Sequence, residues 1–331
     1  MYKHQKQSYW RLVARQFRRN LLADVALVVL LLLGAVAVFA PFLAGDVPIY
    51  MVYQNKTYLL PNVFTYKDLV SVSFDEWQPG PGETAIRPLI PYSPNDPDLY
   101  NTLKGPSREH WLGTDNTGRD VLSRIIWGTR ISMTVGFVAM GIAILIGIIL
   151  GALAGYYGGW VDIVVLRAIE VMLCFPSLIL ILSLIAFLPP SIYNIMIAVG
   201  ITQWPEDARL VRGEFLRLRG GDFATAAHAT GLRDWRIIFR HLLPNALAPV
   251  LVSATFGVAG AILIESSLSF LGFGVPPPTA SWGEILKQSQ QYVEFGWWLV
   301  IFPGAAVFLT VTAFNLVGEG LRDAMDPRLR Q

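Results

Sequence analysis

Long runs of apolar residues constrain this chain more than any other feature of its sequence. Residues 22–44 read LADVALVVLLLLGAVAVFAPFLA, and a run of the same length lies at 131–153. A helix needs about 20 mostly apolar residues to cross a bilayer. Of the 331 residues, 53% are hydrophobic and only 15% are charged, whereas soluble domains have roughly 25% charged residues. These patterns indicate an integral membrane protein.

Six segments have the character of membrane-spanning helices. They lie at 22–44, 131–153, 161–188, 190–205, 246–268 and 297–317. The third segment contains Pro176, which predicts a kink. The fourth is the weakest, because its 16 residues reach only about 24 Å as a helix and the hydrocarbon core is about 30 Å thick. The sequence therefore predicts an all-α integral membrane protein with six transmembrane helices.

The distribution of Lys and Arg predicts the orientation of the chain. Six of them precede the first span, seven Arg lie between the fourth and fifth spans, and three Arg follow the sixth. Loops on the cytosolic side are enriched in Lys and Arg, so both termini are expected in the cytosol. The outward segment also carries seven Lys or Arg, but long loops cross the membrane largely regardless of charge.

This orientation divides the chain into five parts. They are a basic cytosolic N-terminus at 1–21, a first transmembrane helix at 22–44, an extracytoplasmic loop at 45–127, a transmembrane domain at 128–320 with a cytosolic loop at 206–245, and a cytosolic tail at 321–331.

The extracytoplasmic loop carries two kinds of local pattern. The runs IYMVY at 49–53 and KTYLL at 56–60 alternate in the manner of short strands. Near the end of the loop, Val121 and Ile125 recur at helical spacing opposite Asp120 and Arg124. This second pattern predicts an amphipathic helix on the outer membrane interface, ahead of the second span.

The polar stretch 222–245, DFATAAHATGLRDWRIIFRHLLPN, lies between strongly apolar spans. Asp222 is a good N-cap, and Gly231 is a good C-terminal stop for a helix of two turns. A second helix is expected to start at Arg233 or Asp234 and to end near Pro244. Such a short helix is marginal in water, so it needs a packing partner.

The small side chains of the first helix offer two interpretations. Ala224, Ala226 and Ala227 would let another backbone approach closely, which suits contact with a second protein. The alternative is a cytosolic loop that rests on its own helix bundle, and the spacing alone favours this alternative.

The stretch resembles the EAA loop of ABC importer permeases. In that loop a Glu-Ala-Ala is followed after three residues by Gly and later by Ile-x-Leu-Pro. The positions that keep this spacing are Ala226, Ala227, Gly231, Leu243 and Pro244. Two positions depart from it, because Thr225 replaces the Glu and His241 replaces the Ile.

Four other segments resemble the C-type permease subunits of the oligopeptide, dipeptide and nickel importers. They are HWLGTDNTGRDVLSRIIWGTRIS at 110–132, ARLVRGEFL at 208–216, ESSLSFLGFGVPPPTASWGEIL at 265–286 and FNLVGEGLRDAMDPRLR at 314–330. They occur in the order typical of the family, and the likeness covers about residues 110–330. One departure is Glu319, which stands where Asp is common.

The resemblance implies a type I ABC importer permease fold with a cytosolic coupling helix and a large extracytoplasmic loop. Such a subunit sits in a prokaryotic plasma membrane. Its partners are membrane lipid, a homologous permease, two ATPase subunits and an extracytoplasmic solute-binding protein that delivers the substrate. The resemblance implies peptides as the substrate, and oligopeptides in particular. The residues that the resemblance assigns to ATPase coupling are Asp222, Thr225, Ala226, Ala227, Gly231, Leu243 and Pro244.

The sequence agrees with a chain that does not bind ATP itself and relies on partner subunits to hydrolyse it. A P-loop needs Gly-Lys followed by Ser or Thr, and none of the six Lys follows a Gly. Neither a catalytic cluster nor a metal-ligand spacing stands out, so the chain is expected to be no enzyme and to bind no cofactor or metal. The net charge of +2 gives no reason to expect nucleic acid.

Charged residues within apolar runs mark positions of interest, because they are costly at membrane depth. Arg167 and Glu170 are three residues apart and can pair. Glu265 ends an apolar stretch near the outer end of the fifth span. It could face the translocation pathway as a gate residue, or it could hold the SSLSFLGFG turn in place, and both interpretations stay open.

Two other functions compete with a peptide importer. An ion-coupled secondary transporter would often show internal repeats and buried ionisable groups in broken helices, and neither is clear here. An ABC importer of another solute, such as nickel chelates or oligosaccharides, would share the same motifs.

The predicted topology can be tested by cysteine labelling. In a Cys174→Ser background, an impermeant thiol reagent applied to intact cells should label a cysteine within 45–127 and leave a cysteine at position 230 unlabelled. The reverse pattern would show that the topology is inverted, and an intracellular coupling loop would then be impossible.

Overall fold

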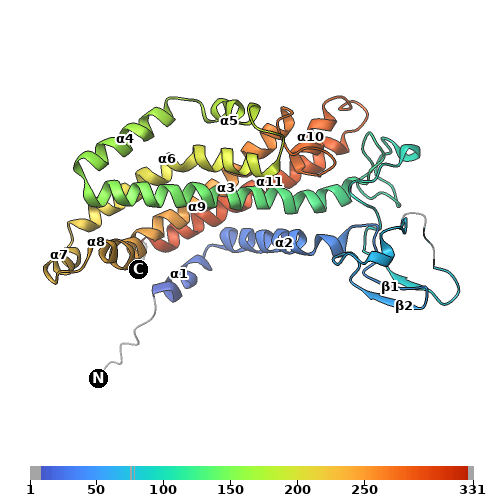
Figure 1. The fold of residues 1–331 in the computed structure, drawn as a ribbon, viewed down its shortest axis with the longest axis horizontal. Coiled ribbons are helices and arrows are strands. Elements are labelled where there is room, and N and C mark those ends of the chain that lie inside the picture. Colours follow the sequence, from blue (N-terminus) through green and yellow to red (C-terminus); the bar gives the residue numbers. More distant parts are fainter. Residues whose placement is uncertain (1–8, 75–76, 78, 327–331) are drawn as a thin grey trace, which may run out of the picture. The chain divides into compact units, whose positions relative to one another are not determined.

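The computed structural model describes the whole chain except residues 1–8, 75–76, 78 and 327–331 (Figure 1). Parts of the predicted N-terminus and tail, including Arg328 and Arg330, therefore lie outside the described residues. The longer helices are α1 Tyr9–Phe17, α2 Leu21–Leu43, α3 Val121–Tyr157, α4 Gly159–Leu173, α5 Ser177–Ala186, α6 Ile192–Arg219, α7 Asp222–Ala229, α9 Leu243–Phe270, α10 Trp282–Ser289 and α11 Trp298–Met325.

The chain forms two compact units. The first comprises the described residues up to Leu30, Val135–Ile264 and the described residues from Thr310 on. The second comprises Leu31–Thr134 and Glu265–Leu309. The boundaries between the units fall inside α2, α3, α9 and α11.

Four helical stretches in the described part of the chain are long and apolar enough to cross a membrane. They are α2, α3, Asp234–Phe270 and α11. Helices α4 and α5 pass this test only as a pair, and they meet at an angle of 86°. The kink predicted at Pro176 is thus a complete break, because a proline disfavours helical backbone at the residue before it. The weak span predicted at 190–205 falls in the first half of α6, so the count of six spans stays a prediction.

The turn between α3 and α4 is tight, as the GYYGGW sequence at 155–160 suggests. α3 ends at Tyr157 and α4 begins at Gly159. Gly158 and Gly159 both have positive φ angles, 66° and 53°. Glycine adopts this conformation without steric cost, which allows two long helices to be joined by one residue.

The interfacial helix predicted ahead of the second span is wrong. Its residues form the first turns of α3, which runs without interruption from Val121 to Tyr157. Arg124 is fully buried, forms an ion pair with Glu284, and places its Nε 3.5 Å from Asp115 Oδ2. The polar side of this helix therefore packs inside the second unit, because carboxylates there compensate a charge that would be costly to bury alone.

A small antiparallel sheet in the second unit confirms the alternating runs. Its strands are β1 Tyr50–Tyr53, β2 Lys56–Leu59 and β3 Thr84–Ile86, in the order β2-β1-β3. The β1–β2 turn consists of Gln54 and Asn55, which both have positive φ angles, 49° and 64°. This is the backbone of a type I′ hairpin turn, whose twist matches that of the flanking strands. Met51, Tyr58 and Leu69 form the core beside the sheet.

Three glycines, each four residues apart, bring α3 close to α6 in the first unit. They are Gly147, Gly151 and Gly155. A Cβ atom on Gly147 would lie 2.6 Å from the Cβ of Asp207, and one on Gly155 would lie 2.6 Å from the Cβ of Phe215. Small residues at this spacing let membrane helices approach closely. The glycines therefore fix the middle of α6 against α3.

Gly151→Ala should lower the free energy of unfolding by about 1–3 kcal/mol, the usual cost of overpacking. The new methyl group would collide with the Ala208 carbonyl and the Val211 side chain. Gly141→Ala is the matched control on the same helix, since a Cβ there meets nothing within 4 Å. Thermal unfolding of the purified variants in detergent measures the difference. Equal midpoints for the two variants would contradict the glycine contact.

Candidate functional site

Helix α7, Asp222–Ala229, begins one residue earlier than predicted. Gly221 is the N-cap, with an extended backbone, and its carbonyl accepts bonds from the N–H groups of Ala224 and Thr225. Asp222 is thus the first helical residue, and its predicted N-cap role is wrong. Its charge still favours the positive end of the helix dipole. The Thr225 hydroxyl, at the position of the family's Glu, donates to the Gly221 carbonyl at 3.3 Å.

The end of α7 confirms the stop predicted at Gly231. This residue has a φ of +71°. Its N–H bonds to the His228 carbonyl at 2.9 Å, and the Leu232 N–H bonds to the Ala227 carbonyl at 3.4 Å. These two bonds are those of a Schellman motif, in which glycine is the preferred residue at the left-handed position.

The small side of α7 faces its own bundle. Ala224 and Ala227 are buried in a cluster with Ile237, Ile238 and Phe215. The expectation that these two alanines are open to a second protein is therefore wrong. They pack against helices of the same chain, as the alternative interpretation predicted. Ala226 lies on the exposed side, so a partner would meet a different set of side chains.

That exposed side carries large aromatic residues and arginines. Phe223 is 42% exposed, Trp235 56% and Phe239 57%. The guanidinium of Arg236 lies 5.6 Å from the ring centroid of Trp235. Arg233 and Arg240 are also exposed. The docking face below is defined as the exposed aromatic residues and arginines of this segment together with Ala226: Phe223, Ala226, Arg233, Trp235, Arg236, Phe239 and Arg240. Asp222, Thr225, His228 and Asp234 of the same segment are exposed as well. The sequence signal for it was a pair of aromatic residues, Trp235 and Phe239, among three arginines.

A tyrosine at the end of α3 holds this segment in place. Tyr156 is buried, and its hydroxyl donates to Asp234 Oδ1 at 2.8 Å. The same oxygen lies 3.4 Å from Nε2 of His228, whose ring stacks on the tyrosine ring. The Arg219 side chain donates to the Tyr156 backbone carbonyl at 2.8 Å. α6, α7 and α8 (Asp234–Arg236) are therefore tied to the same turn of α3.

The second helix of the stretch begins at Asp234 as predicted, but it does not end near Pro244. A π-helical turn, Ile237–Leu242, joins α8 to α9. At its C-terminal end, the Leu243 N–H bonds to the Ile238 carbonyl, five residues earlier in the chain. A widened turn is one way in which a membrane helix accommodates a proline, which has no N–H and collides with the carbonyl four residues earlier. Leu243 and Pro244 therefore lie in the first turn of α9.

Glu265 lies fully buried in the second unit, on α9. Its carboxylate accepts hydrogen bonds from the hydroxyls of four serines. They are Ser269 at 2.8 Å, Ser132 at 3.4 Å, Ser266 at 3.5 Å, and Ser281. Ser269 and Ser281 flank the turn after α9 on both sides. These contacts favour the interpretation that Glu265 holds this turn, and its role in transport stays a prediction.

Comparison with known proteins finds relatives over nearly the whole chain. Residues 147–331 match the family described as binding-protein-dependent transport system inner membrane component. Residues 8–61 match the N-terminal TM domain of oligopeptide transport permease C.

Two relatives match almost end to end. The chain is 39% identical to the dipeptide transport system permease protein of Alkalihalophilus pseudofirmus, and the match covers 98% of this chain and 91% of that protein. It is 33% identical to the oligopeptide transport system permease protein of Bacillus subtilis, again over 98% and 91%. It is 42% identical to the glutathione transport system permease protein of Pectobacterium atrosepticum, over 73% of this chain and 81% of that protein.

Among solved structures, an inward-facing form of the MetNI methionine ABC transporter aligns with a TM-score of 0.51. The alignment covers 62% of this chain and 98% of that chain at 18% identity. At this identity the likeness concerns the fold alone.

Tyr156→Phe should loosen residues 222–236, called the docking segment below, without unfolding the protein. The variant loses the hydroxyl bonds to Asp234 and His228, and one lost hydrogen bond is worth about 0.5–1.5 kcal/mol. Hydrogen exchange at residues 222–236 should therefore become faster. Tyr157→Phe is the control, because the neighbouring ring is 49% exposed. Unchanged exchange in Tyr156→Phe would show that the tyrosine does not fix this segment.

Proposed function

Because the chain belongs to the family of binding-protein-dependent transport system inner membrane components, we propose that it is the permease subunit of an ATP-driven peptide importer. Its resemblance to C-type peptide permeases is confirmed by the two matches that cover nine-tenths of the relatives. It would form half of a translocation pathway, and a homologous permease would form the other half. The chain itself is a membrane permease and not an enzyme.

Peptides are the substrate class that the relatives share. Their names give dipeptides, oligopeptides and glutathione, and all three contain peptide bonds with charged ends. The names thus support peptides as a class and leave the length open. Family membership argues against an ion-coupled secondary transporter, and nothing in the relatives reported above favours nickel chelates or oligosaccharides.

The docking face is the proposed contact with the ATPase subunits, and the observation that carries it is its composition. Trp, Tyr and Arg are the side chains most enriched at the energetic centres of protein interfaces, and Phe is also enriched in interfaces. Here three exposed aromatic rings and three arginines lie on one short segment. The buried alanines behind them do not touch the partner; they let α7 pack tightly on its own bundle.

Force from the ATPases would reach the transmembrane helices through this packing. α7 shares a buried cluster with Phe215 of α6, Ala152 of α3 and Val250 of α9. Packed interiors are close-packed and transmit displacement with little compression. Closure of the ATPases upon ATP binding would therefore shift the ends of three helices together, which would alternate access to the pathway.

The remaining partners follow from the proposed orientation. With both termini in the cytosol, the 45–127 segment faces outward, where a solute-binding protein would deliver its peptide. The small sheet β2-β1-β3 and the turns around it lie in this segment. The chain would span the plasma membrane several times, in agreement with its four apolar helices and the α4–α5 pair.

Trp235→Ala should weaken association with the ATPases roughly tenfold or more, since removing an interface hot spot costs about 2 kcal/mol and about 1.4 kcal/mol is a factor of ten. Tyr193→Ala is the control, because it removes another exposed ring (70%) at the N-terminal end of α6, the end that does not lead into α7. Pull-down of the ATPases and peptide uptake, normalised to inserted protein, measure both effects.

A second pair of variants separates docking from folding. Ala226→Arg should block the contact and leave stability unchanged, because Ala226 is exposed. Ala227→Arg should instead unfold the segment, because Ala227 is buried. If Trp235→Ala and Ala226→Arg both recruit ATPases and transport peptide like the wild type, the docking face is not the coupling element.

A further inference from the structure

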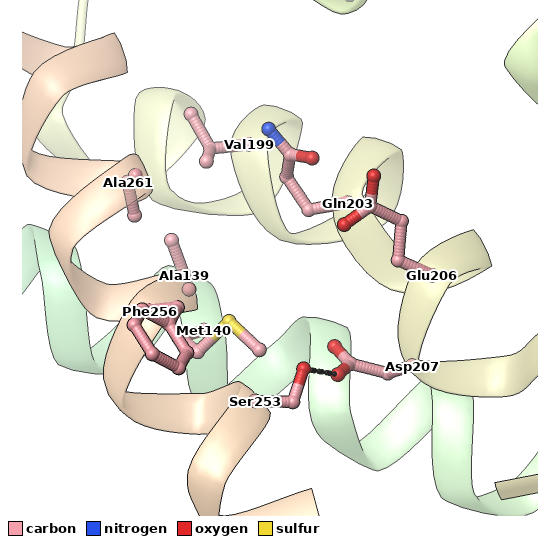
Figure 2. A pocket seen from close by; sticks show the side chains of 11 residues that line it. Ala139, Met140, Val199, Gln203, Glu206, Asp207, Ser253, Phe256 and Ala261 are labelled. Carbon is pink, nitrogen blue, oxygen red and sulfur yellow. Dashed lines mark hydrogen bonds between the residues drawn. The ribbon is translucent and has the colours of Figure 1, made fainter. Parts of the chain in front are cut away.

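A cavity in the first unit lies among α3, α6 and α9 (Figure 2). Its volume is about 190 Å³. A water molecule takes about 30 Å³ in the liquid, so the cavity has room for a charged group and the few carbons next to it. Apolar walls come from α3 and α9, where Met140 and Phe256 border the space, while α6 supplies polar side chains.

Two neighbouring carboxylates of α6 give this cavity its chemistry. Figure 2 shows Gln203, Glu206 and Asp207 beside the space, with Gln203 one turn of α6 before the two acids. Asp207 is buried, and one of its oxygens accepts a hydrogen bond from the Ser253 hydroxyl of α9 at 2.8 Å. Its backbone position is fixed by the contact with Gly147. Asp207 therefore belongs to a rigid wall, whereas the Glu206 side chain borders the cavity and is exposed.

These two acids differ from the other acids of α4 and α6. Elsewhere on α4 and α6, carboxylates pair with arginines: Asp162 with Arg212, Glu170 with Arg167, and Glu214 with Arg217. Among the described residues, neither Glu206 nor Asp207 forms an ion pair. Charges in membrane helices usually pair or line a pathway for an ion or substrate. A hydroxyl and an adjacent like charge do not compensate Asp207.

We propose that this cavity receives a cationic amino group of the peptide as it passes through the permease. Glu206 and Asp207 would supply the opposite charge, and the Gln203 side-chain oxygen would accept a further hydrogen bond from the three N–H groups of an ammonium. The Phe256 ring at the wall suits a cation as well. This inference rests on the proposed function and adds a preference for peptides with an accessible ammonium, from the amino terminus or from a lysine side chain.

The first experiment measures the charge of the cavity without any transport. Gly260 borders the cavity, and a Cβ there meets nothing within 4 Å. In a Cys174→Ser background, Gly260→Cys is treated with a cationic and an anionic methanethiosulfonate of similar size, in the purified importer complex. The cationic reagent should react roughly tenfold faster than the anionic one, relative to their rates with free thiol, because charges act strongly in an apolar site.

Neutralising the acids should abolish this preference. Glu206→Gln and Asp207→Asn, separately and together, should reduce the ratio toward one. Glu214→Gln is the matched control, because it neutralises an acid of the same helix that pairs with Arg217 and lies outside the cavity. Glu206→Gln keeps the test decisive if Asp207→Asn fails to fold. Equal rates for both reagents in the parent protein would overturn the proposal.

The second experiment asks whether the cavity recognises a peptide ammonium. Uptake of Ala-Lys-Ala, of its Nε-acetyl-lysine analogue and of its N-acetylated analogue is compared in proteoliposomes that contain the whole importer. The double variant Glu206→Gln, Asp207→Asn should take up peptides that keep the bound ammonium roughly tenfold more slowly than wild type. Uptake of the analogue in which that ammonium is acetylated should stay near the wild-type rate. The two acetylated peptides thus show which ammonium is bound.

The outcomes separate the two proposals. If wild-type importer carries none of the three peptides, the proposed peptide function fails, and the thiol reactions alone decide whether the cavity attracts cations. If the wild type carries all three and the neutralised variant loses them equally, the carboxylates are structural and the recognition proposal is overturned.

Discussion

The close contact between α3 and α6 is the constraint on which the first unit depends. Glycines 147, 151 and 155 remove the side chains that would otherwise hold the two helices apart. A bulkier residue at any of them would push α6 outward, and with it Asp207 next to Gly147 and the Phe215 side chain next to Gly155. Phe215 in turn belongs to the buried cluster that receives α7. The cavity wall and the docking segment therefore share one helix contact.

The buried arginine cluster of the second unit differs from the two acids at the cavity of the first unit. In the second unit, Arg124 lies between Asp115 and Glu284, and Arg119 forms its own pair with Asp115. Removing one partner from such a cluster would leave an uncompensated charge, so these residues are explained by the local structure. In the first unit, Glu206 and Asp207 border a cavity and have no such arginine. Among the described residues, Glu265 of the second unit also has no arginine, but four serine hydroxyls contact its carboxylate and it does not border this cavity. The cavity together with the missing arginine is therefore the reason to assign a ligand to Glu206 and Asp207.

Local sequence rules predicted features that depend on a few adjacent residues. The stop at Gly231 and the two short strands β1 and β2 are of this kind, and both are present. Features that depend on distant residues were missed. Arg124 is buried because Glu284, 160 residues away, meets it. Ala227 faces inward because Ile237 and its neighbours cover it. Helical periodicity shows which face of a helix is packed, but not whether it packs against the same chain or against a partner protein. The proposed coupling role rests on family resemblance and on the exposed aromatic residues.

The course of α6 shows how a docking event could reach the cavity. From Asp207 to the helix end at Arg219 the distance is about 18 Å along the axis, at about 1.5 Å per residue, and α7 follows three residues later. This stretch is held to α3 by the glycines and by the Arg219–Tyr156 bond. Directly before the acids, Pro205 lies inside the helix and removes one backbone hydrogen bond. α6 is thus stiff between the docking segment and the acids and weakest just beyond them, so a displacement of α7 would move both carboxylates as one body.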